Sequence, residues 1–404
     1  MTDLEELVRI DDPQFYVGDP YPVFARMRKE APAFFCEGLN TFAITRYEDV
    51  RELSRRPEVW SVADGILLND AKYDSHITDS FFPEGAELIS TTDPPRHREL
   101  RRVISTAFTP RMIPSMEDDV RAFTRQLLDT IEPGQEIEFV DDVAVVLPLW
   151  TVARFLGLPG DNIGDLRYWT DEMVKMGGDL GPEELAEAAQ NIGPMNEYLV
   201  DQLERKRREP DDGLLSTLAR AEIDNEKLTD LNVLMLSTAV LVAGNGTTRN
   251  LLGGIMTMLA EHPGQREKLG ADLSLSAGTV DETLRYVSPV PGFLRTAAAD
   301  TEGQGQAVEK GQHAYLLYMS ANRDETVFDD PDTFDITRPT DPGHMAFGFG
   351  QHVCPGNSLA RLECRVLLEE LLPRFPTWEI TGAPMRMMSV LENAWTSLPI
   401  TFDH

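Results

Sequence analysis

Apolar residues recur every three or four positions along most of this chain, the spacing that places them on one face of an α-helix. A few short segments, bounded by turn residues, have the character of strands. The pattern therefore predicts many helices and few strands. The predicted helices cover residues 21–30, 50–56, 96–108, most of 116–208, 211–221, 231–262 and the segment from 357 onward, and the predicted strands cover 33–36, 41–45 and 311–319.

One long stretch interrupts this pattern. Residues 60–92 form an irregular segment rich in Gly, Asp, Ser and Pro. A loop of that length inside a compact domain usually has a function of its own.

A second interruption lies within the predicted helix 231–262. Residues 243–248 read Ala-Gly-Asn-Gly-Thr-Thr. Glycine inside a helix costs about 1 kcal/mol relative to alanine, so Gly244 and Gly246 need a physical reason. Two reasons are open: the close approach of a ligand with a local bulge in the helix, or helix–helix packing on small residues.

The composition is that of a soluble globular protein, with 42% apolar and 26% charged residues among 404. The net charge of −31 argues against nucleic acid or an anionic membrane as a partner. The cysteines, Cys36, Cys354 and Cys364, have no spacing typical of a disulfide framework or a zinc site. The acidic N-terminus lacks the apolar core of a signal peptide, and the longest apolar run, residues 231–244, is too short and too interrupted to span a bilayer. These features predict a cytoplasmic protein.

Cys354 lies in a loop of unusual composition. Gly348 and Gly350 alternate with phenylalanines before it, and Pro355 and Gly356 follow it. Glycine at this density suits a backbone that turns tightly or lies against something large. Because a helix is predicted from residue 357 onward, Cys354 precedes a helix N-terminus, where backbone N–H groups favour a thiolate. Such a thiolate can be a nucleophile, a redox thiol or a metal ligand, whereas a lone cysteine is more often a buried structural thiol.

This loop resembles the haem-ligand loop of the cytochrome P450 family, bacterial soluble type, through the pattern Phe347-Gly348-x-Gly350-x-His352-x-Cys354-x-Gly356. The resemblance implies haem b as cofactor and dioxygen as cosubstrate. It makes Cys354 the thiolate ligand of the iron, to which the sulfur donates electron density. The cofactor-binding residues of the loop would be Phe347, Gly348, His352 and Gly356.

The resemblance extends from about residue 21 to residue 402 and implies the fold of the family. That fold is mainly α with a smaller β-rich portion, in a single domain of triangular outline over residues 1–404. Residues 60–92 would be the substrate-covering loop, and residues 161–208 would be lid helices.

His97 and Arg101 share one face of the predicted helix 96–108. By composition alone they form a solvated basic face. Their pattern, DPP-x-H-x-x-x-R, resembles the clamp that holds the two haem propionates in the family, and a buried dianion needs paired cations. By position, Arg295 resembles a further propionate ligand, and the alternative is an exposed arginine on a strand.

Residues 243–247 resemble the oxygen-activating centre of the family, Ala/Gly-Gly-x-Asp/Glu-Thr. The resemblance places Ala243 and Gly244 against the cofactor. It gives Thr247 a catalytic hydroxyl that hydrogen-bonds dioxygen.

The resemblance fails at Gly246, where the family has an acid that relays protons from solvent. Protons would then pass through water, through Asn245 or Thr248, or through a polar group of the substrate. Our hypothesis is that Gly246 leaves a water-filled notch and that monooxygenation survives, which restoring the acid by Gly246→Glu would test.

Glu282 and Arg285 are three residues apart on a predicted helix, where such ion pairs are common on protein surfaces. Their position resembles the Glu-x-x-Arg pair of the family, which is buried beneath the haem together with a second arginine, here Arg338. We therefore expect a structural role for these three residues.

The resemblance also suggests which residues form the substrate pocket, and a turn at residues 391–395 would return into it. The candidates are mainly apolar, which favours a hydrophobic or aromatic small molecule. They are Ile66, Leu67, Leu68, Val240, Ala243, Val290, Phe293, Leu294 and Trp395.

The function implied is that of a haem-thiolate monooxygenase in bacterial secondary or catabolic metabolism. Electrons would come from a ferredoxin-type partner and its reductase, and the protein would be a monomer without nucleic-acid or membrane partners. Gly246 keeps open a peroxygenase or other non-standard oxidation, and a non-catalytic haem sensor or carrier is a further alternative. The electron donor would dock on basic residues at the cysteine side, namely Arg101, Arg102, Arg111 and Arg361.

Overall fold

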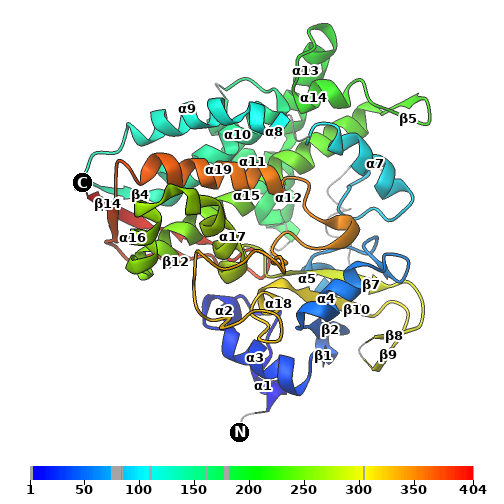
Figure 1. The fold of residues 1–404 in the computed structure, drawn as a ribbon. Helices are drawn as coiled ribbons and strands as arrows, with labels where there is room; N and C mark the ends of the chain where they lie inside the picture. The colour runs from blue at the N-terminus through cyan, green and yellow to red at the C-terminus, as the bar shows by residue number, and fades with distance from the viewer. Residues whose placement is uncertain are drawn as a thin grey trace.

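The computed structural model describes residues 3–73, 83, 85–108, 112–160, 162–176, 182–303 and 305–403. Helices form most of the upper region in Figure 1, and a smaller region built on a sheet lies below them. The expected fold class, mainly α with a smaller β-rich portion, is confirmed.

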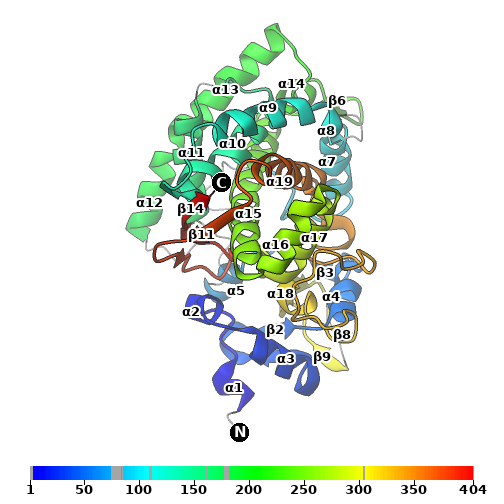
Figure 2. The ribbon, with the colours of Figure 1, turned by 60° about the vertical axis from the view of Figure 1, so that its left-hand side comes forward.

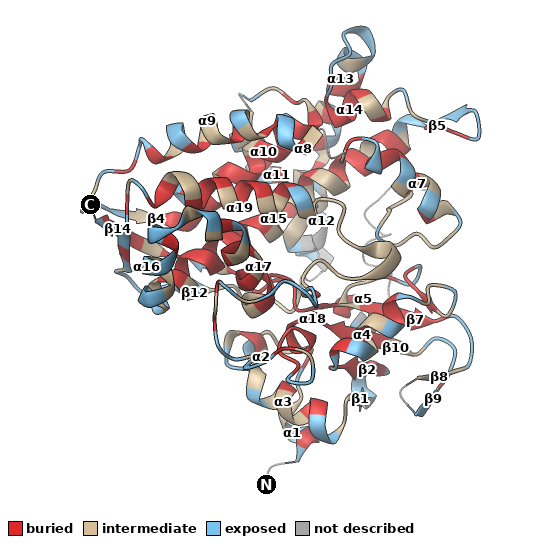
Figure 3. Cartoon of the chain, in the orientation of Figure 1, coloured by how far each residue is buried: buried red, intermediate tan, exposed pale blue. Residues whose placement is uncertain are grey.

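The longest helix, α15 (Asp230–Glu261), runs through the helical region and is buried over most of its length (Figures 2 and 3). The Thr229 side chain caps it by accepting a hydrogen bond from the Asn232 N–H at 3.2 Å. A helix that is apolar on several sides must be covered on several sides. The helices that pack against it are α10 (Val146–Leu156), α11 (Ile163–Met176), α17 (Ser276–Val287) and α19 (Asn357–Leu371).

Within the described part of the chain, α15 is also the one helix long and apolar enough to cross a membrane. The expectation that this segment is too short to do so was wrong, because the helix continues for 32 residues. In the protein, 61% of its most apolar window is buried against neighbouring elements. This burial is typical of the central helix of a protein core.

A five-stranded sheet, in the order β1-β2-β10-β7-β3, joins early and late parts of the chain. β10 runs parallel to β2, and the other pairs are antiparallel. In the register of β10 and β7, Ala314 lies opposite Arg295, which fixes the position of this arginine. The strands are β1 (Ala33–Cys36), β2 (Thr41–Ile44), β3 (Trp60–Ser61), β7 (Gly292–Ala297) and β10 (His313–Leu317).

A three-stranded sheet at the C-terminal end has the order β11-β14-β4, from β11 (Thr377–Ile380), β14 (Pro399–Asp403) and β4 (Glu136–Glu138). It is fastened to the core by Trp378, whose indole N–H donates to the Met256 carbonyl of α15 at 3.1 Å. β11 is thereby held beside α15.

The described residues contain further short strands and helices. The strands are β5 (Glu222–Ile223), β6 (Glu226–Lys227), β8 (Thr301–Gly303), β9 (Gln306–Val308), β12 (Met385–Arg386) and β13 (Trp395–Ser397). The helices are α1 (Leu4–Leu7), α2 (Pro13–Val17), α3 (Tyr21–Glu30), α4 (Tyr47–Ser54), α5 (Leu68–Tyr73), α7 (Arg96–Ser105), α8 (Met112–Ser115), α9 (Glu117–Leu128), α12 (Pro182–Asn191), α13 (Gly193–Arg208), α14 (Leu214–Leu218), α16 (Pro263–Ala271) and α18 (Tyr318–Ala321), with single turns η1 (Glu37–Leu39), η2 (Val140–Ala144), η3 (Leu273–Leu275) and η4 (Gly350–His352).

The observed elements differ from the predicted ones where contacts between distant parts of the chain determine the local secondary structure. The stretch 60–92 is not wholly irregular, because it contains β3 and α5, which bury Trp60 and Leu68. β4 interrupts the helical span 116–208 because it pairs with β14 from the far end of the chain. The helix expected over 211–221 shortens to α14. Residues 74–82 and 84 of the expected substrate loop, and residues 161 and 177–181 of the expected lid, lie outside the described residues.

Candidate functional site

Cys354 sits in a loop that folds back on itself directly before α19. Its N–H donates to the Phe347 carbonyl at 2.9 Å, and the Asn357 side-chain amide donates to the Cys354 carbonyl at 2.7 Å. Gly350 (φ +75°) admits no side chain, because a Cβ there would lie 2.3 Å from the Ser54 carbonyl oxygen of α4. The loop is thus held between α4 and α19.

Other residues of the loop shape its surface. The Phe347 ring lies under the Arg361 guanidinium, 4.6 Å from its carbon. Gly348 (φ +69°) lies beside the Tyr318 hydroxyl. A Cβ at Gly356 would lie 3.9 Å from the Cys354 sulfur, so glycine there keeps the space next to the sulfur clear.

The surroundings of the Cys354 thiol act on its pKa in opposite directions. Burial raises the pKa and prevails, while hydrogen bonds from the backbone N–H groups of Gly356 and Asn357 and the charge of Arg101 lower it. The backbone N–H groups at the helix N-terminus therefore favour the thiolate, as expected, but burial outweighs their effect on the pKa. A cation bound to the sulfur would supply the missing stabilisation, since coordination deprotonates a thiol.

Four basic side chains lie close together beside this loop: His97, Arg101, Arg295 and His352. The rings of His97 on α7 and His352 lie 4.0 Å apart between their centroids. Burial, then the charge of Arg101, lowers the pKa of His97 to about 4. Burial, then His97, Arg295 and Arg101, lowers the pKa of His352 to about 3. Protonating either imidazole is therefore unfavourable unless an anion is near.

This set fits the two propionates of haem b. Nδ1 of His97 and Nε2 of His352 are buried and have no hydrogen-bond partner among the described residues, whereas buried polar atoms normally have one. Burial lowers the pKa of Arg101, and no described carboxylate offsets that effect. His97 and Arg295 are 1% and 5% exposed, which excludes a solvated basic face for the one and an exposed strand position for the other.

One face of α15 is left uncovered in the middle of the helix. Ala243 is exposed, and Val240 and Thr247 are half-buried, between turns that are otherwise buried. These residues share one side of the helix by their spacing, and we refer to them as the open face of α15. The Thr247 hydroxyl donates to the Ala243 carbonyl at 2.9 Å. Thr247 and Ala243 therefore lie together on the open face of α15.

The other residues of this segment point elsewhere. Gly244 faces α10, because a Cβ there would lie 2.9 Å from a methyl group of Val152, so its assignment to the cofactor was wrong and helix packing explains the glycine. The buried Asn245 donates to the Thr170 hydroxyl of α11 at 3.1 Å, and Thr248 is 3% exposed. Neither lies on the open face. α15 continues through the glycines without a bulge.

Gly246 has an unexpected neighbour, Glu392. A Cβ at Gly246 would lie 2.8 Å from Glu392 Oε1, so the notch is occupied by a carboxylate, and the expectation of a notch filled by water was wrong. Sequence reasoning missed Glu392. The available signal was an acidic residue within the turn at residues 391–395 that was expected to return toward the pocket.

The candidate pocket residues separate into two groups. Ile66, Leu67 and Phe293 are half-buried, as is suitable for a pocket wall. Leu68 and Leu294 were wrong, because both are buried in a cluster with the N-terminal helices. Successive side chains of a strand alternate between its faces, so β7 cannot direct both Phe293 and Leu294 to one pocket.

Two further candidates are mainly packing residues. Val290, between α17 and β7, is 8% exposed. Trp395 lies against α15, because a Cβ at Gly253 would be 3.0 Å from its ring, and Arg386 lies over the ring at 5.0 Å. Both side chains therefore pack against the core. Neither residue belongs to the open face of α15.

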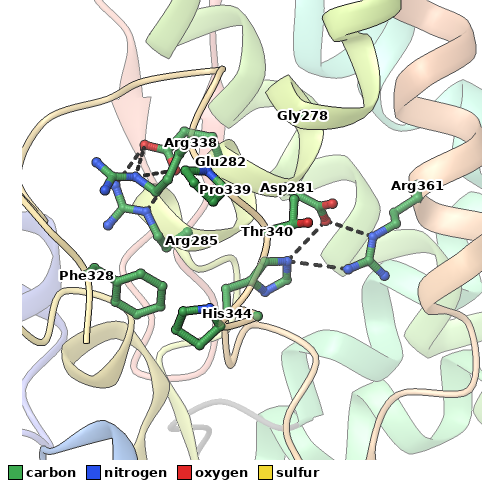
Figure 4. Close-up of a pocket in the computed structure, with 12 residues that line it drawn as sticks. Gly278, Asp281, Glu282, Arg285, Phe328, Arg338, Pro339, Thr340, His344 and Arg361 are labelled. Carbon is green, nitrogen blue, oxygen red and sulfur yellow. Dashed lines mark hydrogen bonds and ion pairs between the residues drawn. The ribbon is translucent and has the colours of Figure 1, made fainter.

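Glu282, Arg285 and Arg338 form the cluster that was expected (Figure 4). Arg285 donates to both carboxylate oxygens of Glu282 at 2.8 Å, and Arg338 Nε lies 3.2 Å from Oε2. They line a cavity of about 390 Å³ with Asp281, His344 and Arg361. Its walls are ion-paired and contain none of the candidate substrate residues, so this cavity is distinct from the expected substrate pocket.

Comparison with known proteins agrees with this geometry. The family model described as Cytochrome P450 matches residues 183–394. The chain is 36% identical to a putative cytochrome P450 126 of Mycobacterium tuberculosis, over 89% of each chain, and 33% identical to linalool 8-monooxygenase of Pseudomonas putida, over 97% of this chain and 98% of that one. The solved structure of cytochrome P450 CYP109Q5 from Chondromyces apiculatus superposes with a TM-score of 0.85 at 32% identity, covering 98% of each chain. The chain belongs to the cytochrome P450 family.

Proposed function

We propose that this enzyme inserts one oxygen atom of dioxygen into a small hydrophobic molecule, using electrons from a ferredoxin-type donor and its reductase. Members of the family bind haem b through a cysteine thiolate and use dioxygen for monooxygenation, the chemistry that the cofactor supplies when bound. The observation that carries the proposal is the Thr247 hydroxyl on the open face of α15.

In this proposal each group of site residues has a separate role. Cys354 would ligate the iron, and the N–H groups of Gly356 and Asn357 donate hydrogen bonds to its sulfur. His97, Arg101, Arg295 and His352 hold the propionates, which supply the anionic partners that this cluster needs. Thr247 would offer to dioxygen the hydroxyl that donates here to the Ala243 carbonyl. The Glu282 cluster is structural.

The pocket favours an apolar substrate. We assign to its wall the described residues Ile66, Leu67, Val240, Ala243 and Phe293, which offer dispersion contacts and one aromatic ring. The relative from Pseudomonas putida is named for linalool, a small terpene alcohol. Terpenoids, steroids and aromatic intermediates of secondary or catabolic metabolism are the classes to test.

The electron donor docks at the cysteine side through basic side chains. Arg102 on α7 is exposed, and the Arg361 side chain is 37% exposed although it is paired with Asp281 at 2.8 Å. Arg101 belongs to the propionate cluster, and Arg111 lies outside the described residues. Arg102→Glu should slow reduction by an acidic ferredoxin at low salt and leave substrate affinity unchanged. Equal reduction rates for parent and variant would contradict this docking site.

The protein acts as a cytoplasmic monomer in this proposal, in line with its soluble composition and high net negative charge of −31. Size-exclusion chromatography with light scattering tests the oligomeric state. A stable dimer would exclude it.

A peroxide-driven oxidation is the second candidate, because Gly246 stands where the family motif has an acid. Product formation with hydrogen peroxide but none with a ferredoxin and reductase would favour it. Product formed only with the reductase system would exclude it.

The first experiment is a carbon monoxide difference spectrum of the dithionite-reduced protein. We expect the red-shifted Soret band of thiolate ligation, and its loss in Cys354→Ala. Linalool and testosterone then serve as probes for a change in haem spin state and for product formed with isotope-labelled dioxygen. A spectrum without the thiolate band in the folded parent would overturn the proposed function.

A further inference from the structure

Glu392 is a buried carboxylate in an unusual position. It lies between β12 and β13, is 5% exposed, and directs Oε1 at Gly246, where a Cβ would be only 2.8 Å away. Its Oε2 accepts a hydrogen bond from Arg249 Nη2 at 3.2 Å. One oxygen is therefore held by a cation, and the other lies beside the residue that precedes Thr247.

Glu392 is the inner end of a charged row formed with Arg249 and Asp171. Arg249 Nη1 donates to Asp171 Oδ1 of α11 at 3.3 Å. Side-chain exposure rises from 6% for Glu392 and 8% for Arg249 to 34% for Asp171. The charged row thus leads from the partly solvated surface of α11 to the segment of α15 that carries Thr247.

The reaction needs such a route. Conversion of a substrate RH and dioxygen to ROH and water consumes two electrons and two protons, and the donor protein supplies only the electrons. Ionisable groups move protons when they can hold and release them near neutral pH. Arginine remains protonated, so Arg249 positions the Glu392 side chain, and Glu392 is the carboxyl group of the row that lies beside Gly246 and can exchange a proton.

The turn around Glu392 is held by other residues. The N–H groups of Leu391 and Glu392 donate to the Ser389 hydroxyl at 3.1 Å. Asn393 donates from its N–H to the Pro289 carbonyl at 2.9 Å and from its side chain to the Val287 carbonyl at 2.5 Å. The turn is therefore anchored without the carboxylate, whose burial needs another reason.

We propose that Glu392 delivers protons to the Thr247 side of the pocket, in place of the acid that is absent at position 246. In each transfer the Glu392 O–H bond breaks as an O–H bond forms on a water or on the Thr247 hydroxyl oxygen, and that group releases its own proton toward the pocket. Water along the charged row then gives a proton to the carboxylate and takes one up from solvent at the Asp171 end. The missing side chain of Gly246 is what makes room for Glu392. The inference rests on the proposed monooxygenase function.

The central test is Glu392→Gln in the haem-loaded protein, because glutamine keeps the size of the side chain and removes its ionisation. With ferredoxin, reductase and linalool or testosterone, whichever the parent converts, we expect product formation to fall roughly 100-fold with a changed solvent isotope effect. The reaction H₂O₂ + RH → ROH + H₂O needs no net protons and should fall much less. Substrate-induced spin change should remain that of the parent, while loss of the buried charge beside Arg249 should lower the unfolding temperature.

A matched control is Glu325→Gln, since Glu325 is also paired with an arginine, Arg28, at 2.9 Å, but on another part of the molecule. We expect its turnover to equal that of the parent. Parent-like turnover and isotope effect in Glu392→Gln would overturn the proposal. A parent without reductant-driven product would instead refute the proposed function, so the two failures are distinguishable.

A second pair of variants tests the proposal if Glu392→Gln does not fold. Gly246→Glu alone should lose activity, because its Cβ meets the Glu392 carboxylate, whereas Gly246→Glu with Glu392→Ala should recover reductant-driven turnover. Recovery of stability without turnover would overturn the relay. Independently of activity, Gly246→Ala should lower the unfolding temperature more in the parent than in Glu392→Ala, and equal shifts would show that the contact is absent.

Discussion

The imidazole rings of His97 and His352 lie 4.0 Å apart, and the free nitrogen of each is buried without a described partner. Loss of one charge-assisted hydrogen bond to a propionate costs about 2 kcal/mol, or roughly 30-fold in affinity. His97→Leu should therefore weaken haem binding by that factor, measured by haem transfer to apomyoglobin. The control Arg98→Leu changes an exposed residue of the same helix and should retain haem; equal loss in both would contradict the assignment.

The Glu282–Arg285 pair is buried, with side chains 2% and 3% exposed. Removing one partner leaves the other charge uncompensated, which costs about 3–5 kcal/mol. Glu282→Gln should lower the free energy of unfolding by that amount in denaturant titrations. Asp230→Asn, which breaks the exposed pair with Arg207, should cost about 1 kcal/mol or less. Similar losses in the two variants would mean that the buried pair is not essential to the fold.

Asp281 makes part of the stability dependent on pH. Burial raises its pKa, but the hydrogen bond from His344 and the charge of Arg361 outweigh burial, so the pKa lies below its usual value. A carboxyl group with a lowered pKa stabilises the protein above its unfolded pKa of about 4, and this contribution is lost as the pH falls through the folded value. Asp281→Asn should be less stable than the parent at pH 7, with a shallower loss below about pH 4. Urea titrations across this range measure both effects, and parallel curves would exclude Asp281 as their source.

Gly350 is required by the backbone of the cysteine loop. Its φ of +75° costs about 1–2 kcal/mol for a residue with a side chain, and a Cβ would also meet the Ser54 carbonyl at 2.3 Å. Gly350→Ala should reduce the unfolding free energy and haem content together. The control Gly270→Ala lies in α16, where a Cβ meets nothing within 4 Å, and should be neutral or stabilising by about 0.5–1 kcal/mol. Normal haem content in Gly350→Ala would show that the loop can shift without consequence.

Thr247 and Thr257 both donate their hydroxyl to a carbonyl four residues earlier on α15, at 2.9 and 3.0 Å. Only Thr247 lies on the open face. Thr247→Ala should keep the thiolate spectrum but convert less of the consumed reductant into product and more into hydrogen peroxide, by roughly 10-fold or more. Thr257→Ala should keep the coupling of the parent. Unchanged coupling in Thr247→Ala would remove the hydroxyl from the mechanism.

Much of the site was visible in local motifs. Within each motif the residues lie within ten positions of one another. This holds for the glycines around Cys354, for His97 and Arg101, and for Glu282 and Arg285. Their spacing alone therefore indicated their roles. The pocket wall was less predictable. Leu294 was misassigned because it lies on the face of β7 opposite to Phe293, and Leu68 because α5 buries it.

The sequence by itself determined the helices, the cysteine loop and the family, since periodicity and motif spacing are properties of neighbouring residues. It also revealed the missing acid at Gly246. Only the tertiary structure decided what stands in that place. Arg249 and Glu392 are 143 positions apart, and they meet because Asn393 anchors the turn between β12 and β13 to the end of α17, which packs against α15. Such a contact depends on how distant elements pack together, and the pattern of neighbouring residues does not predict it.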